Sequence, residues 1–254
     1  MQAPRQINRE CARARPDMPI WCGSEALAAR PAVARRRGNL TMIEKYSFGP
    51  ALRARLSANL GAFERTSVDN AELRQAGVVI VVVRNLLDDS ASVLLTKRPE
   101  NLRRHAGQFA LPGGRLEPGE TSTQAAIREL AEEMRLHIGA ADILGTLDDF
   151  PTRSGFRITP VVAWGGDVGE IDPDPVEVAK VFRIPLTELD SPAIPRLTGS
   201  QQDDKPPVMS APLPTTGGVV YAPTAALLYQ FREVAMHGRP TRVAHFDQPR
   251  FAWK

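Results

Sequence analysis

The sequence predicts an α/β or α+β layer fold, because strand-like and helix-like segments alternate along the chain. The strand signal is strongest in the β-branched run at residues 77–83, which has the length of a strand buried on both faces. The helix signal is strongest at residues 121–137, where apolar residues recur at the spacing of one helix face. With 254 residues, 43% of them hydrophobic, the chain is long enough for one large domain with appendages.

Each further element follows from local patterning. Apolar residues at helical spacing indicate the first helix. The last helix is indicated by an amphipathic pattern with a proline at its start. Seven prolines in residues 185–218 predict a long irregular loop. The expected elements, in chain order, are a helix at 48–63, strands at 77–83 and 92–98, the helix at 121–137, strands at 143–150, 157–164, 178–184 and 219–221, and a helix at 223–237.

The distribution of charge argues against binding to nucleic acid. The formal net charge is +3, but residues 1–42 hold eight arginines and three acids, which leaves the remainder slightly acidic. A protein that binds a duplex needs a basic stripe, and the body of the chain has none. No stretch approaches the ~18 consecutive apolar residues of a membrane span. We therefore expect neither a nucleic-acid nor a membrane partner.

Residues 1–42 are expected to form a disordered, arginine-rich leader. Both cysteines, Cys11 and Cys22, lie in it, so disulfides cannot hold the rest of the fold. The leader is alternatively an extension upstream of a start at Met42, or a segment that faintly resembles an organellar transit peptide. We expect a cytoplasmic protein, with mitochondrial import as the alternative.

Three glutamates lie together on one face of the central predicted helix. Glu129, Glu132 and Glu133 occupy positions i, i+3 and i+4, opposite the apolar stripe, and Glu120 precedes the helix. Such a cluster is most often only a solvated helix face. The Pro112-Gly113-Gly114 turn before it alters this interpretation, because its glycines let the backbone approach a ligand closely. Hard oxygen ligands of this kind suit Mg²⁺ or Mn²⁺, whose usual substrates are phosphates.

This segment resembles the Nudix box, which fixes a glycine, a glutamate and an Arg-Glu-aliphatic-x-Glu-Glu-x-Gly-aliphatic run at set spacing. Every defining position matches except the last glycine, which is Arg135. The segment reads Gly114-RLEPG-Glu120-TSTQAAI-Arg128-Glu129-Leu130-Ala131-Glu132-Glu133-Met134-Arg135-Leu136. The resemblance implies a Nudix-type α/β/α sandwich with a mixed sheet at residues 75–240. A helix and connection at 43–74 would precede it, and a C-terminal tail at 241–254 would follow it.

Segments outside the box are similar to the coenzyme A pyrophosphatase branch of the same superfamily. Residues 94–114 follow its LLTxR, LRxHxGQ and FPGG pattern, with Leu111 in place of the phenylalanine. Residues 152–160 look like its TxSGxxVxP segment. Residues 176–182 look like its DEVxxVF segment, with Val176 in place of the aspartate.

The resemblance also implies a metal site. Glu129, Glu132 and Glu133 match the family's ligands for Mg²⁺ or Mn²⁺, and the Gly114 carbonyl is a further candidate. Arg128 would orient the carboxylates. Its guanidinium can grip a carboxylate with two parallel hydrogen bonds.

Other roles are assigned by position in the pattern. Glu120 is expected to support the loop, and the general base is left open between Glu132 and Glu177. We assign no role to His137, His237 or His245, which show no ligand spacing. The candidates for substrate binding are Arg98, Arg103, His105, Gln108 and Ser154.

Arg135 is the main departure from the pattern. The glycine it replaces ends the helix, where left-handed backbone geometry is common. A non-glycine residue in that geometry costs about 1 kcal/mol. We therefore expect the helix to run on by a turn and stop at Gly139, with activity retained.

The resemblance implies hydrolysis of the diphosphate of coenzyme A or acyl-CoA, giving 3′,5′-ADP and 4′-phosphopantetheine or its acylated form. The alternatives are a Nudix pyrophosphatase acting on another nucleoside diphosphate derivative, such as ADP-ribose or NADH, and a non-catalytic Nudix regulator that binds a nucleotide. We expect a monomer or a homodimer whose partner is the small-molecule substrate.

Overall fold

The computed structural model describes residues 42–101, 106–199 and 206–249. The chain divides into two compact units, residues 1–39 and 40–254, and the described residues belong to the second. The predicted disordered leader therefore lies almost entirely outside the described residues, as do Arg103 and His105.

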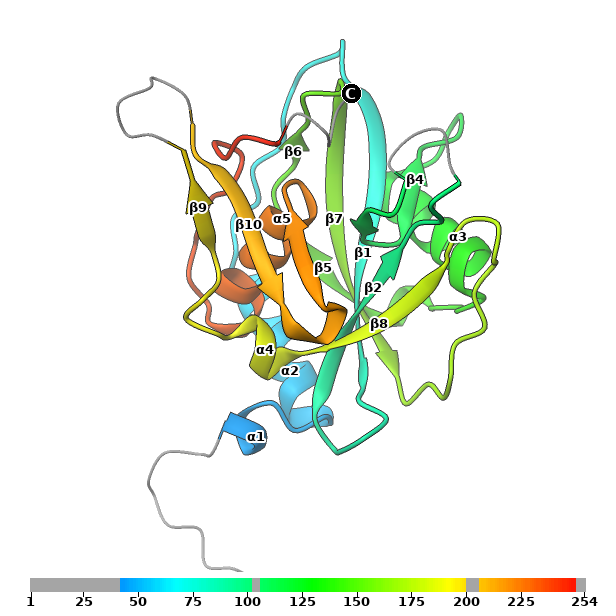
Figure 1. The fold of residues 1–254 in the computed structure, drawn as a ribbon, viewed down its shortest axis with the longest axis vertical. Helices are drawn as coiled ribbons and strands as arrows, with labels where there is room; N and C mark the ends of the chain where they lie inside the picture. Colours follow the sequence, from blue (N-terminus) through cyan, green and yellow to red (C-terminus); the bar gives the residue numbers. More distant parts are fainter. Residues whose placement is uncertain (1–41, 102–105, 200–205, 250–254) are drawn as a thin grey trace, which may run out of the picture. The chain divides into compact units, whose positions relative to one another are not determined.

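A mixed sheet of eight strands forms the centre of the fold (Figure 1). Its main path runs β3-β2-β1-β7-β5, while β4 pairs with β1, β6 with β7 and β8 with β2. Strands β1 and β7 are parallel, and the other pairs are antiparallel. The strands are β1 (Arg74–Arg84), β2 (Ala91–Lys97), β3 (Phe109–Ala110), β4 (Gly113–Arg115), β5 (Ile143–Thr146), β6 (Phe150–Pro151), β7 (Phe156–Gly166) and β8 (Lys180–Pro185).

A second sheet and the helices complete the described part of the chain. The second sheet is antiparallel, in the order β11-β10-β9. Its strands are β9 (Arg196–Thr198), β10 (Val208–Leu213) and β11 (Gly218–Tyr221). The helices are α1 (Met42–Lys45), α2 (Pro50–Gly61), α3 (Ser122–Met134), α4 (Leu186–Leu189) and α5 (Thr224–Phe231), with 3₁₀ turns η1 (Ala140–Asp142) and η2 (Pro214–Thr216) and a π-helix η3 (Arg232–Met236).

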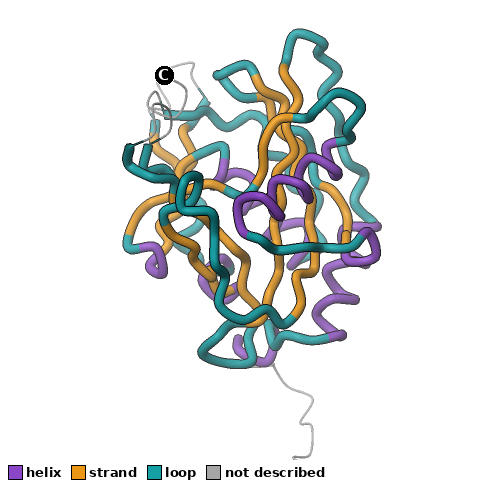
Figure 2. Tube along the Cα trace, turned by 90° about the vertical axis from the view of Figure 1, so that its right-hand side faces the viewer, coloured by secondary structure: helices purple, strands orange, loops and turns teal. Residues whose placement is uncertain are grey.

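Strand alternation divides the core between the two faces of the central sheet. Val79, Val81 and Val83 of β1 pack with Leu130 and other apolar residues of α3. Figure 2 views the molecule from this side, with α3 lying across the strands. The intervening β1 residues, such as Ile80, pack on the opposite face with α2, α5 and the second sheet. The predicted layered arrangement, with a mixed sheet between helices, is confirmed.

The predicted irregular loop at 185–218 is wrong. This segment contains α4, β9, β10 and η2, although several prolines interrupt it. Pro212 lies inside β10, beyond the residues that pair with β9, so its missing N–H costs no hydrogen bond on that side. Pro214 begins η2, where a proline is tolerated in the first turn.

Two helix ends also differ from prediction. Helix α3 ends at Met134, and the expected extension to Gly139 does not occur. Arg135 instead takes the left-handed geometry itself, with φ 52° and ψ 29°, and its N–H bonds to the Ala131 carbonyl oxygen. The predicted C-terminal helix at 223–237 is α5 followed by the π-helix η3. No helix in the described part of the chain is long and apolar enough to cross a membrane.

Candidate active site

Helix α3 is held at its start by a capping box and by contact with β1. Thr121 and Gln124 form a reciprocal capping box that satisfies backbone donors at the helix start. The first turn lies directly on β1 at Gly77, where a Cβ atom would come within 2.0 Å of the Ser122 carbonyl oxygen. This contact sets the helix against the strand that pairs with β4.

The Gly113-Gly114 turn forms β4 and lies against the carboxylate face of α3. A Cβ atom on Gly114 would be 2.1 Å from Oε1 of Glu129, so only glycine leaves room for that carboxylate. The backbone N–H of Gly113 hydrogen-bonds Glu133 one turn further on. The turn and the helix therefore bring backbone groups and two carboxylates to one place, as the Gly-rich loop predicted.

Arg128 is the centre of a group that we call the Arg128 cluster, which comprises Arg128, Glu120 and Glu132. Its guanidinium donates to both carboxylate oxygens of Glu120 at 2.9 and 3.2 Å, and to Glu132 at 3.1 Å. It also donates to Glu129 at 3.0 Å and to the Arg115 carbonyl oxygen at 3.0 Å. These hydrogen bonds hold the pKa of Glu120 below its usual range and raise that of Arg128.

Glu129, Glu133 and Glu177 form a second group, the glutamate triad. Each offers a carboxylate oxygen that lies within 4.8 Å of the other two. Glu177 comes from the loop before β8, and this loop is fixed to α3 because the Asp174 N–H donates to the Glu133 carbonyl oxygen at 2.9 Å. Glu132 is not part of the triad, since its side chain is 56% exposed and turned to Arg128.

Glu133 is the buried member of the triad. It is 4% exposed, and its Oε2 atom has no hydrogen-bond partner among the described residues. Burial, and then the negative charge of Glu129, raise the pKa of Glu133 to about 8. Burial also raises the pKa of Glu129. A buried, unpartnered carboxylate oxygen facing two other carboxylates is what a divalent cation with hard oxygen ligands would satisfy.

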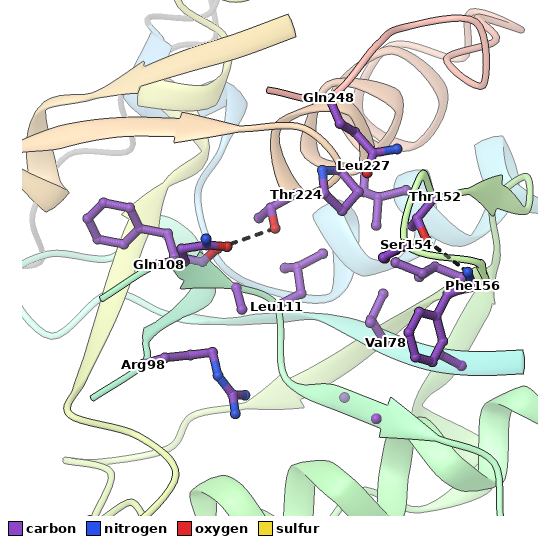
Figure 3. A pocket seen from close by; sticks show the side chains of 17 residues that line it. Val78, Arg98, Gln108, Leu111, Thr152, Ser154, Phe156, Thr224, Leu227 and Gln248 are labelled. Carbon is purple, nitrogen blue, oxygen red and sulfur yellow. Dashed lines mark hydrogen bonds between the residues drawn. The ribbon is translucent and has the colours of Figure 1, made fainter. Parts of the chain in front are cut away.

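A cavity of about 300 Å³ (Figure 3) is lined in part by Gly113 and Gly114 of β4, and Gly114 lies against Glu129 of the triad. Of the predicted substrate-binding residues, Arg98, Gln108 and Ser154 all line it, as does Gly114. Figure 3 shows Arg98 and Gln108 on one side and Ser154 on the opposite side. Arg98 also lies close enough to Glu133 to lower the pKa of that carboxyl against the effect of burial.

The rest of the cavity wall is largely apolar, and sequence reasoning missed most of it. Val78 and Leu111 line it from the central sheet and its adjoining turn, and Phe156 from the start of β7. Thr224 and Leu227 come from α5, where the Thr224 hydroxyl donates to the Phe109 carbonyl oxygen at 3.4 Å. A proline at the start of a helical pattern had located α5, but nothing in the pattern indicated that the helix faces the site.

A layered α/β fold with converging carboxylates on its central helix, beside a largely apolar cavity, is the arrangement expected of a metal-dependent pyrophosphohydrolase, an enzyme that hydrolyses phosphoanhydride bonds. The NUDIX domain model matches residues 73–206. The chain belongs to the Nudix family and is a Nudix hydrolase.

Curated relatives carry the same family name. Nudix hydrolase 3 of Caenorhabditis elegans is 32% identical over 168 residues, which cover 63% of this chain and 70% of that protein. The uncharacterized Nudix hydrolase NudL of Cronobacter sakazakii is 42% identical over 122 residues, and the match spans 59% of its length. Among solved structures, a MutT/nudix family protein from Enterococcus faecalis is 15% identical, with a TM-score of 0.42 over 68% of this chain and 67% of that one.

Proposed function

We propose that this Nudix hydrolase cleaves the diphosphate of coenzyme A and acyl-CoA, giving 3′,5′-ADP and 4′-phosphopantetheine or its acylated form. The observation that carries the proposal is the largely apolar cavity beside the glutamate triad, with Arg98 at the boundary between them. A diphosphate with one long, mostly uncharged arm matches this combination of a charged site and an apolar cavity.

The metal site in this proposal is built on the triad. Glu129 and Glu133 would hold Mg²⁺ or Mn²⁺ together with the Gly114 carbonyl, and Glu132, held by Arg128, is a further candidate ligand. A divalent cation held there would supply the positive charge that phosphate oxygens need during phosphoanhydride hydrolysis. Arg128 keeps the carboxylates oriented through its hydrogen bonds and acts as a positioning residue.

The chain's own groups would perform the remaining tasks. Water attacks one phosphorus, the bridging P–O bond breaks, and the second phosphate departs with the bond's electron pair. A general base accepts the proton of the attacking water. Glu177 is an exposed member of the triad and Glu132 is exposed beside it, so both remain candidates for the base. Arg98 and Gln108 would contact the diphosphate from the cavity wall, with Ser154 on the opposite side.

Product analysis after incubation with coenzyme A and acetyl-CoA in Mn²⁺ tests the proposal. Formation of 3′,5′-ADP together with the matching phosphopantetheine is the expected result. Hydrolysis of ADP-ribose and NADH is measured in parallel. A higher kcat/KM for either of them than for coenzyme A would show that coenzyme A is not the preferred substrate. Tight nucleotide binding with no hydrolysis of any diphosphate would instead indicate a regulator.

The base is assigned by comparing Glu132→Gln with Glu177→Gln. Loss of the base removes the acid limb of the kcat–pH profile, whereas loss of a metal ligand raises the Mn²⁺ concentration needed for half-maximal activity. If both variants change only the metal requirement, neither residue is the base.

A further inference from the structure

Two arginines meet on one aromatic ring beside the cavity. The guanidinium carbon of Arg74 lies 4.0 Å from the centre of the Phe156 ring, and that of Arg115 lies 5.1 Å from it. Arg74 also donates to the Ser154 carbonyl oxygen at 2.8 Å. Neither arginine forms an ion pair with a carboxylate in the described part of the chain. Two guanidiniums thus contact the same ring, and neither is ion-paired with a carboxylate among the described residues.

Strand register places both arginines on the cavity side of the sheet. Arg74 is paired with Phe156 across β1 and β7, and Arg115 is paired with Ala76 across β1 and β4. Side chains of directly paired residues share a face, and residues two apart on one strand do also. Because Ala76 and Phe156 line the cavity, Arg74 and Arg115 extend the same wall towards solvent.

A separate hollow of about 440 Å³ opens between these arginines and the loop before α3. Its charged lining consists of Arg74, Arg115, Glu117 and Glu120. The charge of Glu120 is balanced by its two hydrogen bonds from Arg128, so the remaining three groups leave one net positive charge. Arg115 adjoins Gly114, which lies against the triad, so the hollow is next to the proposed position of the diphosphate.

We propose that Arg74 and Arg115, supported by Phe156, bind a phosphate monoester on the nucleotide arm of the substrate. The proposal rests on the proposed function, in which this group is the 3′-phosphate that coenzyme A carries and that dephospho-CoA, ADP-ribose and NADH lack. Planar guanidiniums match the oxygens of a phosphate with paired hydrogen bonds, and a supporting ring reduces the freedom they lose on binding. Arg98 lies near enough to Glu133 to lower the pKa of that carboxyl, and the proposed function assigns Arg98 to the diphosphate, so the two tasks fall to different arginines.

The test compares coenzyme A with dephospho-CoA as substrates of the whole chain in Mn²⁺. We expect wild type to prefer coenzyme A in kcat/KM by about tenfold or more, chiefly through KM, since charge-assisted hydrogen bonds to the monoester are lost with dephospho-CoA. In the Arg74→Gln/Arg115→Gln double variant this ratio should fall to within about threefold of one. Because the ratio compares two substrates on one protein, a general loss of activity cancels out. Arg53→Ala is the matched control, since Arg53 pairs with Asp142 and lines neither the cavity nor the hollow.

Equilibrium binding of the two nucleotide products separates this inference from the proposed function. Wild type should bind adenosine 3′,5′-bisphosphate more tightly than 5′-AMP, and the double variant should bind the two equally. Equal turnover of coenzyme A and dephospho-CoA by wild type would overturn the arginine site while leaving the proposed function intact. If neither is cleaved, the proposed function fails, and the binding comparison alone decides whether the arginines recognise a monoester. A double variant that keeps the wild-type preference also overturns the inference.

Discussion

The Arg128 cluster and the glutamate triad lie next to each other on α3, yet their charges are balanced in opposite ways. In the Arg128 cluster the protein supplies the cation itself, and Glu120 has a lowered pKa as a result. In the triad three carboxylates converge, and the described residues leave Oε2 of Glu133 with no hydrogen-bond partner. Burial, and then the negative charge of Glu129, raise the pKa of Glu133 to about 8. Glu129 belongs to the triad and also contacts Arg128, so it joins the two groups.

The contrast indicates which carboxylates a divalent cation would stabilise most. A metal ion stabilises a carboxylate that is already paired with arginine less than it stabilises a buried carboxylate crowded by other carboxylates. Changes at Glu133, at Arg128 and in pH test this division, and a change at Arg135 tests whether the end of α3 affects it.

The largest effect is expected from Glu133→Gln. The amide keeps the size of the side chain but removes its charge, so we expect kcat in Mn²⁺ to fall on the order of a thousandfold. Circular dichroism and melting temperature should show an intact fold. Glu72→Gln, an exposed glutamate outside the site, is the matched control. Turnover of Glu133→Gln close to that of wild type would exclude Glu133 from the metal site.

Arg128→Lys is expected to have a smaller effect. Lysine keeps the charge but cannot make the five hydrogen bonds that the guanidinium makes, so orientation of the carboxylates is lost. We expect a 10–100-fold fall in kcat/KM, typical of residues that hold metal ligands in place. The Mn²⁺ concentration for half-maximal activity should rise as well, which a purely structural role would not cause. An unchanged metal requirement would show that Arg128 does not orient the triad.

In metal-free protein, the free energy of unfolding should depend on pH because the buried Glu133 of the triad titrates. The pKa of Glu133 is raised from 4.5 to about 8, so its contribution to stability is complete below pH 4.5 and is lost as pH rises to about 8. Within that window each pH unit costs up to about 1.4 kcal/mol of unfolding free energy. Urea unfolding in EDTA at pH 5.5 and 7.5 measures this slope.

Two controls isolate the triad in that experiment. Glu133→Gln should have a shallower slope than wild type, because its amide does not titrate. Saturating Mn²⁺ should stabilise wild type most at the higher pH, where the carboxylates are ionised, since a ligand that binds only the native state raises its stability. Parallel slopes for wild type and Glu133→Gln in EDTA would contradict the raised pKa.

The sequence predicts the α3 side of the site better than it predicts the cavity side. The α3 side was predictable because helix geometry alone sets the spacing of Glu129 and Glu133, and the box residues fix the preceding turn. The position of Glu177 depends on a loop hydrogen-bonded to the end of α3, and only the resemblance pointed to it. The cavity wall formed by Phe156 and Thr224 depends on packing between segments far apart in the chain, which local patterns do not encode. In the same way, local patterns did not reveal β10, because Pro212 is tolerated there only through its position beyond the residues that pair with β9.

The smallest effect is expected from Arg135→Gly, at the other end of α3 from the capping box. Arg135 is held at φ 52°, so glycine relieves about 1 kcal/mol of backbone strain, although greater freedom in the unfolded chain offsets part of it. The lost ion pair with Asp172 is exposed on both sides and contributes little. We expect a rise in melting temperature of about 1–3 °C, in line with a change of less than 1 kcal/mol in a domain of this size. Because the triad is positioned by residues before Arg135, kcat should stay within about twofold of wild type. A hundredfold increase in hydrolysis would show that the geometry of the helix end controls the carboxylates after all.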